Sequence, residues 1–148
     1  MNAPILIVRT VSVEKLSPVL DACRARWPQH PLLVVTNAVR GSELRSDSRI
    51  AEIIPYATGA EGFVASIPCD HALEAVVVPI GNHGGSGYAN VLRACRDLRS
   101  RTWFLAAYSR ELNELSARQW NRQWRRELAL QIPARWLGAC WARWMLRG

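Results

Sequence analysis

The chain has 148 residues, 49% of them hydrophobic, and carries a formal net charge of +7, so we expect one soluble domain with one buried core. Its four cysteines are scattered and form no C-x-x-C pair, which disfavours a disulfide framework or a zinc site. No apolar run approaches the roughly 20 residues that span a bilayer, and no signal-peptide pattern opens the chain, so we expect a cytoplasmic location.

Strand and helix patterns alternate along the first part of the chain. Strands are predicted where short apolar runs are rich in branched residues, and helices where apolar positions recur at three- and four-residue spacing. The Ser17-Pro18 pair offers an alternative start for the first helix. In chain order the predicted elements are a strand at 4–10, a helix at 13–27, a strand at 31–36, a helix at 43–53, strands at 53–56 and 74–80, a helix at 88–99 and a strand at 102–108.

This alternation predicts an α/β fold, a Rossmann-like three-layer sandwich with a mostly parallel five-stranded sheet, over residues 1–109. If the strand order is 3-2-1-4-5, the loops after the first and fourth strands open into one crevice at the topological switch point. The glycine-rich turn after the fourth strand then presents backbone N–H groups to a ligand. The residues expected to bind that ligand are Arg9, Thr10, Ser12, Gly81, Asn82, His83, Gly84, Gly85, Ser86 and Gly87.

Nucleotide signatures are absent from this crevice. The first loop has no glycine, Asn37 stands where an acid would hold a ribose, and no Gly-Lys-Ser or Gly-Lys-Thr follows the glycines. We therefore expect no cofactor and no metal. Glu14 is the one candidate catalytic residue near the first strand, where it would act as a base, with an ion pair to Arg9 as its alternative role.

Several segments are similar to the N-terminal, acceptor-side half of the heptosyltransferase-like enzymes of glycosyltransferase family nine, which have the GT-B fold. They are the first strand ending in Arg9-Thr10, RARWP at 24–28, IAEIIPY at 50–56 and LEAVVVPIGN at 73–82, within residues 5–108. The resemblance implies a bacterial glycosyltransferase-like domain that binds a sugar or a lipid-linked acceptor. The family's Gly-Asp loop and its second, donor-binding domain have no counterpart here, so independent catalysis is not expected.

Residues 110–148 differ in composition from the rest of the chain. They hold eight of the eighteen arginines and five of the seven tryptophans, and we expect an amphipathic helical tail that runs from 111 to 130 and again from 134 to 146. Arginine opposite tryptophan is typical of a helix at a membrane interface, and the same face would also suit packing on the domain or on a partner protein. The expected membrane or partner contacts are Trp120, Trp124, Arg125, Trp136, Trp141 and Trp144.

Two functions remain open from the sequence. The first is an incomplete glycosyltransferase-like domain held at the inner membrane surface, cytoplasmic but peripheral to the bilayer. The alternative is a non-catalytic scaffold, or an accessory subunit, that docks to a protein complex through its C-terminal helices. Nucleic acid is disfavoured as a partner, because the tail is amphipathic rather than uniformly basic and the chain has one lysine.

Overall fold

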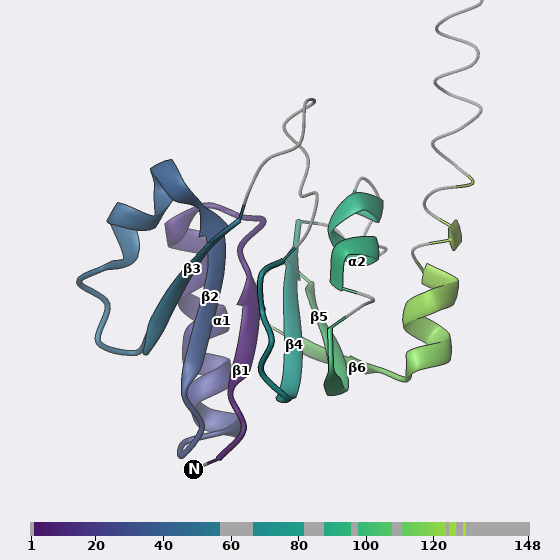
Figure 1. The fold of residues 1–148 in the computed structure, drawn as a ribbon, viewed down its shortest axis with the longest axis horizontal. Coiled ribbons are helices and arrows are strands. Elements are labelled where there is room, and N and C mark those ends of the chain that lie inside the picture. Colours follow the sequence, from purple (N-terminus) through teal and green to yellow (C-terminus); the bar gives the residue numbers. More distant parts are fainter. Residues whose placement is uncertain are drawn as a thin grey trace, which may run out of the picture.

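The fold is α/β, with a six-stranded, mostly parallel sheet between helices (Figure 1). The structure is a computed structural model and describes residues 2–56, 67–81, 88–95, 98–107, 111–123, 125–126 and 129. The elements in chain order are β1 (Ile5–Val8), α1 (Val13–Arg26), β2 (Leu32–Asn37), the 3-10 helix η1 (Ala38–Leu44), β3 (Glu52–Tyr56), β4 (Leu73–Ile80), α2 (Ala89–Cys95), β5 (Ser100–Ala107) and β6 (Glu111–Leu115).

The strand order is β3-β2-β1-β4-β5-β6, which confirms the expected 3-2-1-4-5 order and adds one strand. β1 pairs in parallel with β2 on one side and with β4 on the other, as Ile7 opposite Val34 and Val77 shows. β6 pairs antiparallel with β5, with Leu112 opposite Ala106. The switch point of the sheet therefore lies between β1 and β4.

Two apolar clusters hold the layers together, one on each face of the sheet. On one face α1 contributes a stripe at helical spacing, Leu16, Val19, Leu20 and Cys23, all of which are buried. On the other face α2 contributes Leu92 and Cys95, which have no exposed surface. In Figure 1, α1 lies behind the sheet and α2 in front of it.

The helix α1 begins at Val13, so the alternative start at Ser17-Pro18 is wrong. Pro18 lies inside the helix and has no N–H to donate to the carbonyl of Glu14. Glu14 is exposed in the first turn, where water can hydrogen-bond that carbonyl. The proline is tolerated because it falls close to the solvated end of the helix.

The helix predicted at 43–53 is also wrong. Helical structure starts directly after β2, because the Asn37 side chain accepts a hydrogen bond from the N–H of Val39 at 2.9 Å. Turns follow at 45–51, where Asp47 accepts from the Arg49 N–H at 3.0 Å. Short polar side chains that bond to nearby backbone compete with the helix, and here they end it.

The helix predicted from residue 111 is corrected as well, because residues 111–115 form β6 within the sheet. Leu112 packs against one apolar cluster and Leu115 against the other. A spacing of three residues puts two side chains on one side of a helix but on opposite faces of a strand. Arg26 of α1 contacts both β6 and β5, since its guanidinium lies 3.2 Å from the Glu114 carboxylate and 4.8 Å from the Phe104 ring centroid.

Candidate functional site

The carboxyl ends of β1 and β4, where the sequence predicted a ligand-binding crevice, lie side by side in the sheet. The Thr10 hydroxyl, two residues after β1, donates a hydrogen bond to the carbonyl of Pro79 in β4. This bond joins the two strands on either side of the switch point. The Thr10 hydroxyl, which was expected to bind a ligand, therefore donates its one hydrogen within the fold.

Arg9 is enclosed by the fold and bonded to protein groups, whereas the sequence placed it among ligand-binding residues. Its side chain is only 5% exposed. The guanidinium donates to the carbonyls of Val11 at 3.2 Å and Arg40 at 2.9 Å, and to Glu43 Oε2 at 2.9 Å. Arg9 therefore fastens η1 to the end of β1, and its carboxylate partner is Glu43 rather than Glu14.

Glu14 and Ser12 lie exposed at the start of α1. The Ser12 hydroxyl donates to the Glu14 carboxylate and lowers its pKa, with smaller contributions from the Glu14 N–H and the Arg9 charge. A lowered pKa lies further from neutral pH and makes the carboxylate a weaker general base. The electrostatics of Glu14 therefore do not favour proton abstraction.

The glycine-rich turn is closed at its base by Tyr88, whose hydroxyl oxygen accepts from the Gly81 N–H at 3.0 Å. A side chain at position 81 would bring its Cβ within 3.2 Å of that hydroxyl. Gly81 therefore allows a close approach of two chain segments, and its N–H is already satisfied. The other candidate residues of the turn, Asn82, His83, Gly84, Gly85, Ser86 and Gly87, lie outside the described residues.

A cavity of about 440 Å³ lies beside β2 and β3, beneath η1, and the sequence did not predict it. Thr36, which is 1% exposed, and Gly41 belong to its lining, with Arg45 at an exposed position. The turn at 45–51 also contributes to the lining. Arg49 holds this turn, because its guanidinium donates to both carboxylate oxygens of Asp47, at 2.9 and 2.7 Å, and to the carboxylate of Asp21. The Asn37 cap was the available sequence signal for η1.

The C-terminal helical segment, residues 117–123, 125–126 and 129, begins with a reciprocal cap. The Ser116 N–H donates to Gln119 Oε1 at 2.7 Å, and the Gln119 N–H donates to the Ser116 hydroxyl at 3.3 Å. This is a capping box, which satisfies two N–H groups at a helix start. It fixes where the chain leaves β6 and becomes helical.

Trp120 lies in the core, which corrects its expected role as a membrane or partner contact. Its side chain is 2% exposed, and its indole N–H donates to the Leu92 carbonyl of α2 at 3.0 Å. Its ring centroid lies 6.4 Å from that of Trp103 in β5. Packing on the domain, the alternative left open by the sequence, is what this side chain does.

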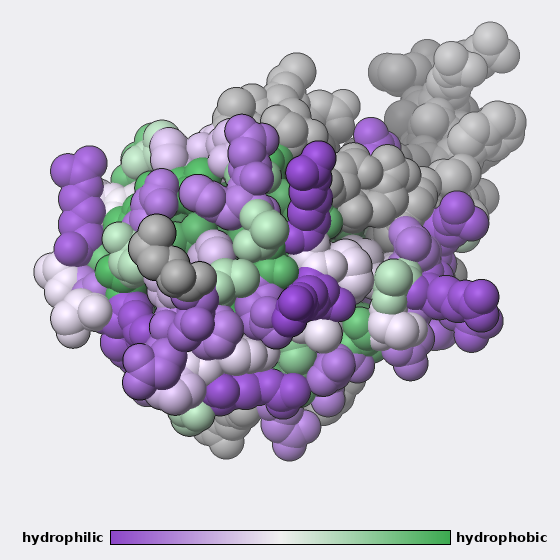
Figure 2. Space-filling model, turned by 60° about the horizontal axis from the view of Figure 1, so that its bottom comes forward, coloured by the Kyte–Doolittle hydropathy of each residue, from purple (hydrophilic) through white to green (hydrophobic). Residues whose placement is uncertain are grey.

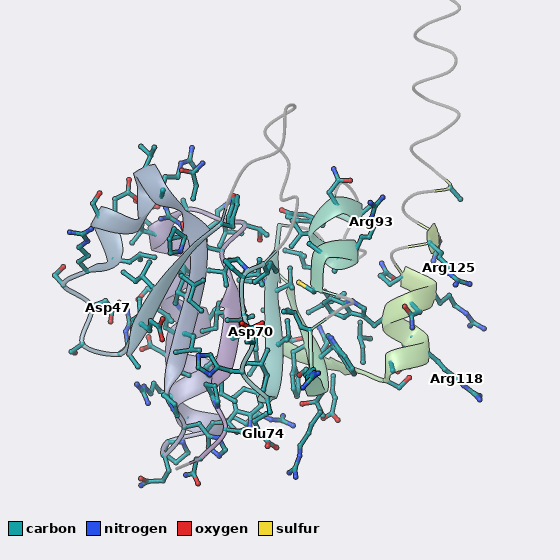
Figure 3. The ribbon with its side chains drawn as sticks, in the orientation of Figure 1. Asp47, Asp70, Glu74, Arg93, Arg118 and Arg125 are labelled. Atoms are coloured by element: carbon teal, nitrogen blue, oxygen red, sulfur yellow. The ribbon has the colours of Figure 1, made fainter. Side chains whose placement is uncertain are left out.

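Four arginines follow one side of the same segment: Arg118, Arg122, Arg125 and Arg126, here called the arginine stripe. All four are exposed and, together with Asn121, line a hollow of about 620 Å³. Arg118 and Arg125 project away from the sheet (Figure 3), and hydrophilic side chains gather at this end of the molecule (Figure 2). The other expected contacts, Trp124, Trp136, Trp141 and Trp144, lie outside the described residues.

Within the described ranges, no three His, Cys, Asp or Glu side chains converge into a cluster that could hold a metal ion. No helix in the same ranges is long and apolar enough to cross a bilayer. Burial raises the pKa of the Cys23 thiol to about 12 and also raises that of Cys69. A high thiol pKa disfavours the reactive thiolate, so neither cysteine suits a nucleophile.

No protein-family model, no curated protein and no solved structure shows significant similarity to this chain.

Proposed function

We propose that this protein is a non-catalytic accessory domain with a Rossmann-like body, which docks onto another component of the cell through its C-terminal helical segment. One observation carries the proposal: polar groups at the ends of β1 and β4 are used within the fold. The Arg9 guanidinium, the Thr10 hydroxyl and the Gly81 N–H all have intramolecular partners. A substrate at this crevice would have to displace those bonds.

Glu14, the candidate catalytic residue, does not supply catalytic chemistry by itself. Glu14 is ionised, and its close partners are the Ser12 hydroxyl and its own backbone N–H. Acid–base catalysis of group transfer generally needs a positioned group with a pKa near the working pH. The geometry around Glu14 favours a surface carboxylate at the start of a helix.

Docking through the C-terminal helical segment is supported by the way the segment is mounted. Trp120 and the Ser116 cap fix it to the body, while the arginine stripe is exposed. Because the helix backbone is already fixed, binding costs only side-chain freedom, which favours affinity for an anionic surface. The body therefore acts as a support for the stripe.

A second candidate is the glycosyltransferase-like domain that the sequence resemblance implies. The strand order supports it, because β1 and β4 are neighbours at a switch point, where α/β folds bind ligands. The ligand would be a sugar or a lipid-linked acceptor held between Ser12 and the glycine-rich turn. This candidate depends on the glycines of that turn.

Thermal unfolding of the full chain with glycolipid acceptors, and with the nucleotide sugars UDP-glucose, ADP-glucose and GDP-mannose, separates the two candidates. We expect no rise in Tm and no transferred sugar by mass spectrometry, because a ligand stabilises only the state that it binds. The control is the Gly84→Ala/Gly85→Ala double variant. A rise in Tm that this variant loses would overturn the accessory function in favour of the glycosyltransferase-like one.

A further inference from the structure

The arginine stripe is defined by helical geometry. At 3.6 residues per turn its four members fall within roughly 100° of one face, and Trp120 lies about 160° around the helix from Arg122. From Arg118 to Arg126 the stripe extends about 12 Å along the axis, at about 1.5 Å per residue. The indole in the core thus sets which way the four guanidinium groups face.

Three of the four arginines in the stripe have no ion pair with the rest of the described chain. No carboxylate among the described residues pairs with Arg118, Arg122 or Arg126, whereas Arg9, Arg26 and Arg49 each have one. Four exposed cations within so short a distance repel one another. An external anion relieves that repulsion, so the stripe favours an anionic partner.

The chemistry of the stripe favours phosphate. A guanidinium presents a planar fork of donors that matches phosphate oxygens two at a time. Among the described residues, this side of the helix carries no large apolar side chain: besides arginine it has the exposed Gln119, the half-buried Asn121 and the exposed Ala129. Protein interfaces generally depend on apolar anchors at their centre, and single-stranded nucleic acid is held by aromatic stacking.

We propose that the arginine stripe binds the phosphate groups of an anionic phospholipid surface. The proposal rests on the proposed docking function and names its partner. A lipid surface presents a continuous layer of phosphates that needs no apolar pocket on the protein. The sequence after the stripe, with Trp136, Trp141 and Trp144 among arginines, has the composition of an interfacial segment and favours lipid over nucleic acid.

The test is flotation of the full-length protein with vesicles of phosphatidylcholine alone and with roughly one third phosphatidylglycerol. The variant is Arg118→Gln/Arg122→Gln/Arg125→Gln/Arg126→Gln. The matched control removes four exposed arginines elsewhere, Arg40→Gln/Arg45→Gln/Arg99→Gln/Arg101→Gln, for the same change in net charge. Circular dichroism and a thermal melt establish that each variant is folded.

We expect the wild type and the control to float with the anionic vesicles and the stripe variant to remain at the bottom of the gradient. Each arginine near an anionic leaflet changes partition about fivefold, so four together change it several hundredfold. Raising KCl from about 0.1 to about 0.5 M should release the wild type, because the Debye length shortens.

Three results would overturn the lipid assignment. They are equal loss of flotation by the control, no flotation of the wild type, and stripe-dependent binding of fluorescent single-stranded RNA that exceeds binding to anionic vesicles. The RNA result would leave the accessory function in place with a different partner. Failure of the accessory function itself is read separately, from sugar transfer and the nucleotide-sugar melts.

Discussion

Arg9 shows how one buried side chain sets the role of a whole crevice. Its residue type, at the end of the first strand, suggested ligand binding, because a cation at a switch point suits anions. Its partners Glu43 and the Arg40 carbonyl lie 34 and 31 residues further along the chain. Sequence spacing cannot reveal such a pairing, since it depends on how η1 packs beside β1.

Replacing Arg9 tests this structural role. Arg9→Met should lower the free energy of unfolding by about 2–4 kcal/mol, because two carbonyls and a carboxylate lose a buried donor. Urea denaturation measures the change. Arg40→Met is the control and should stay within about 0.5 kcal/mol, since only the backbone of this exposed residue is used. A ligand-binding Arg9 would instead show little loss of stability.

Trp120 makes a similar prediction at the opposite end of the chain. Trp120→Ala should cost about 3–5 kcal/mol. Trp120→Phe should cost about 1–2 kcal/mol, because phenylalanine keeps a six-membered aromatic ring but loses the pyrrole ring and its bond to the Leu92 carbonyl. Chemical denaturation gives both values, with Arg118→Ala as a surface control. Equal stability of the alanine variant and the wild type would place Trp120 outside the core.

Among the elements, strands were predicted more accurately than the segments that connect them. β1, β2 and β4 are buried runs rich in branched apolar residues, and the predicted ranges of all five strands from β1 to β5 overlap the observed ones. β6 was missed because Leu112 and Leu115 have helical spacing in a segment with few branched residues. Its pairing comes from β5, which lies next to it in the sheet and needs a partner along its edge.

The 45–51 turn carries a pH-dependent element of stability. Hydrogen bonds from Arg49, with help from its charge, hold the pKa of Asp47 below its usual range despite partial burial. A lowered folded-state pKa adds stability above the ordinary Asp range, near 3.9, that is lost as the pH falls through the folded value.

The Asp47→Asn variant isolates that contribution. The difference in unfolding free energy between wild type and variant should be largest near neutral pH and should shrink as the pH falls below about 4. Urea titrations across this range measure it. The exposed Asp70→Asn change is the control, and a gap between wild type and Asp47→Asn that stays constant with pH would contradict the assignment.

At the scale of the whole molecule, the sheet and its apolar faces include residues well beyond 109. A chain that ends at residue 109 loses β6 and Trp120, and uncovers Trp103 and the edge of β5. We expect it to aggregate or to melt well below the full chain, whereas a chain that ends at residue 129 stays folded. Light scattering and thermal melts would show this, and a stable monomer ending at 109 would refute it.

Thiol labelling offers a second view of global stability. Cys23 and Cys95 have no exposed surface, and burial raises the pKa of both thiols. Their alkylation by iodoacetamide should therefore track global unfolding, while half-buried Cys69 reacts earlier. Peptide mass spectrometry separates the three sites. Rapid labelling of Cys95 in the native protein would indicate that α2 opens locally.

The short helix α2 has one further consequence. The Tyr88 hydroxyl, just before α2, accepts a hydrogen bond from the Gly81 N–H. The Leu92 carbonyl, within α2, accepts one from the indole N–H of Trp120. A displacement of α2 would thus reach both the crevice and the mounting of the arginine stripe. If occupancy of one end displaces this helix, thermodynamic reciprocity requires each site to alter the affinity of the other by the same factor.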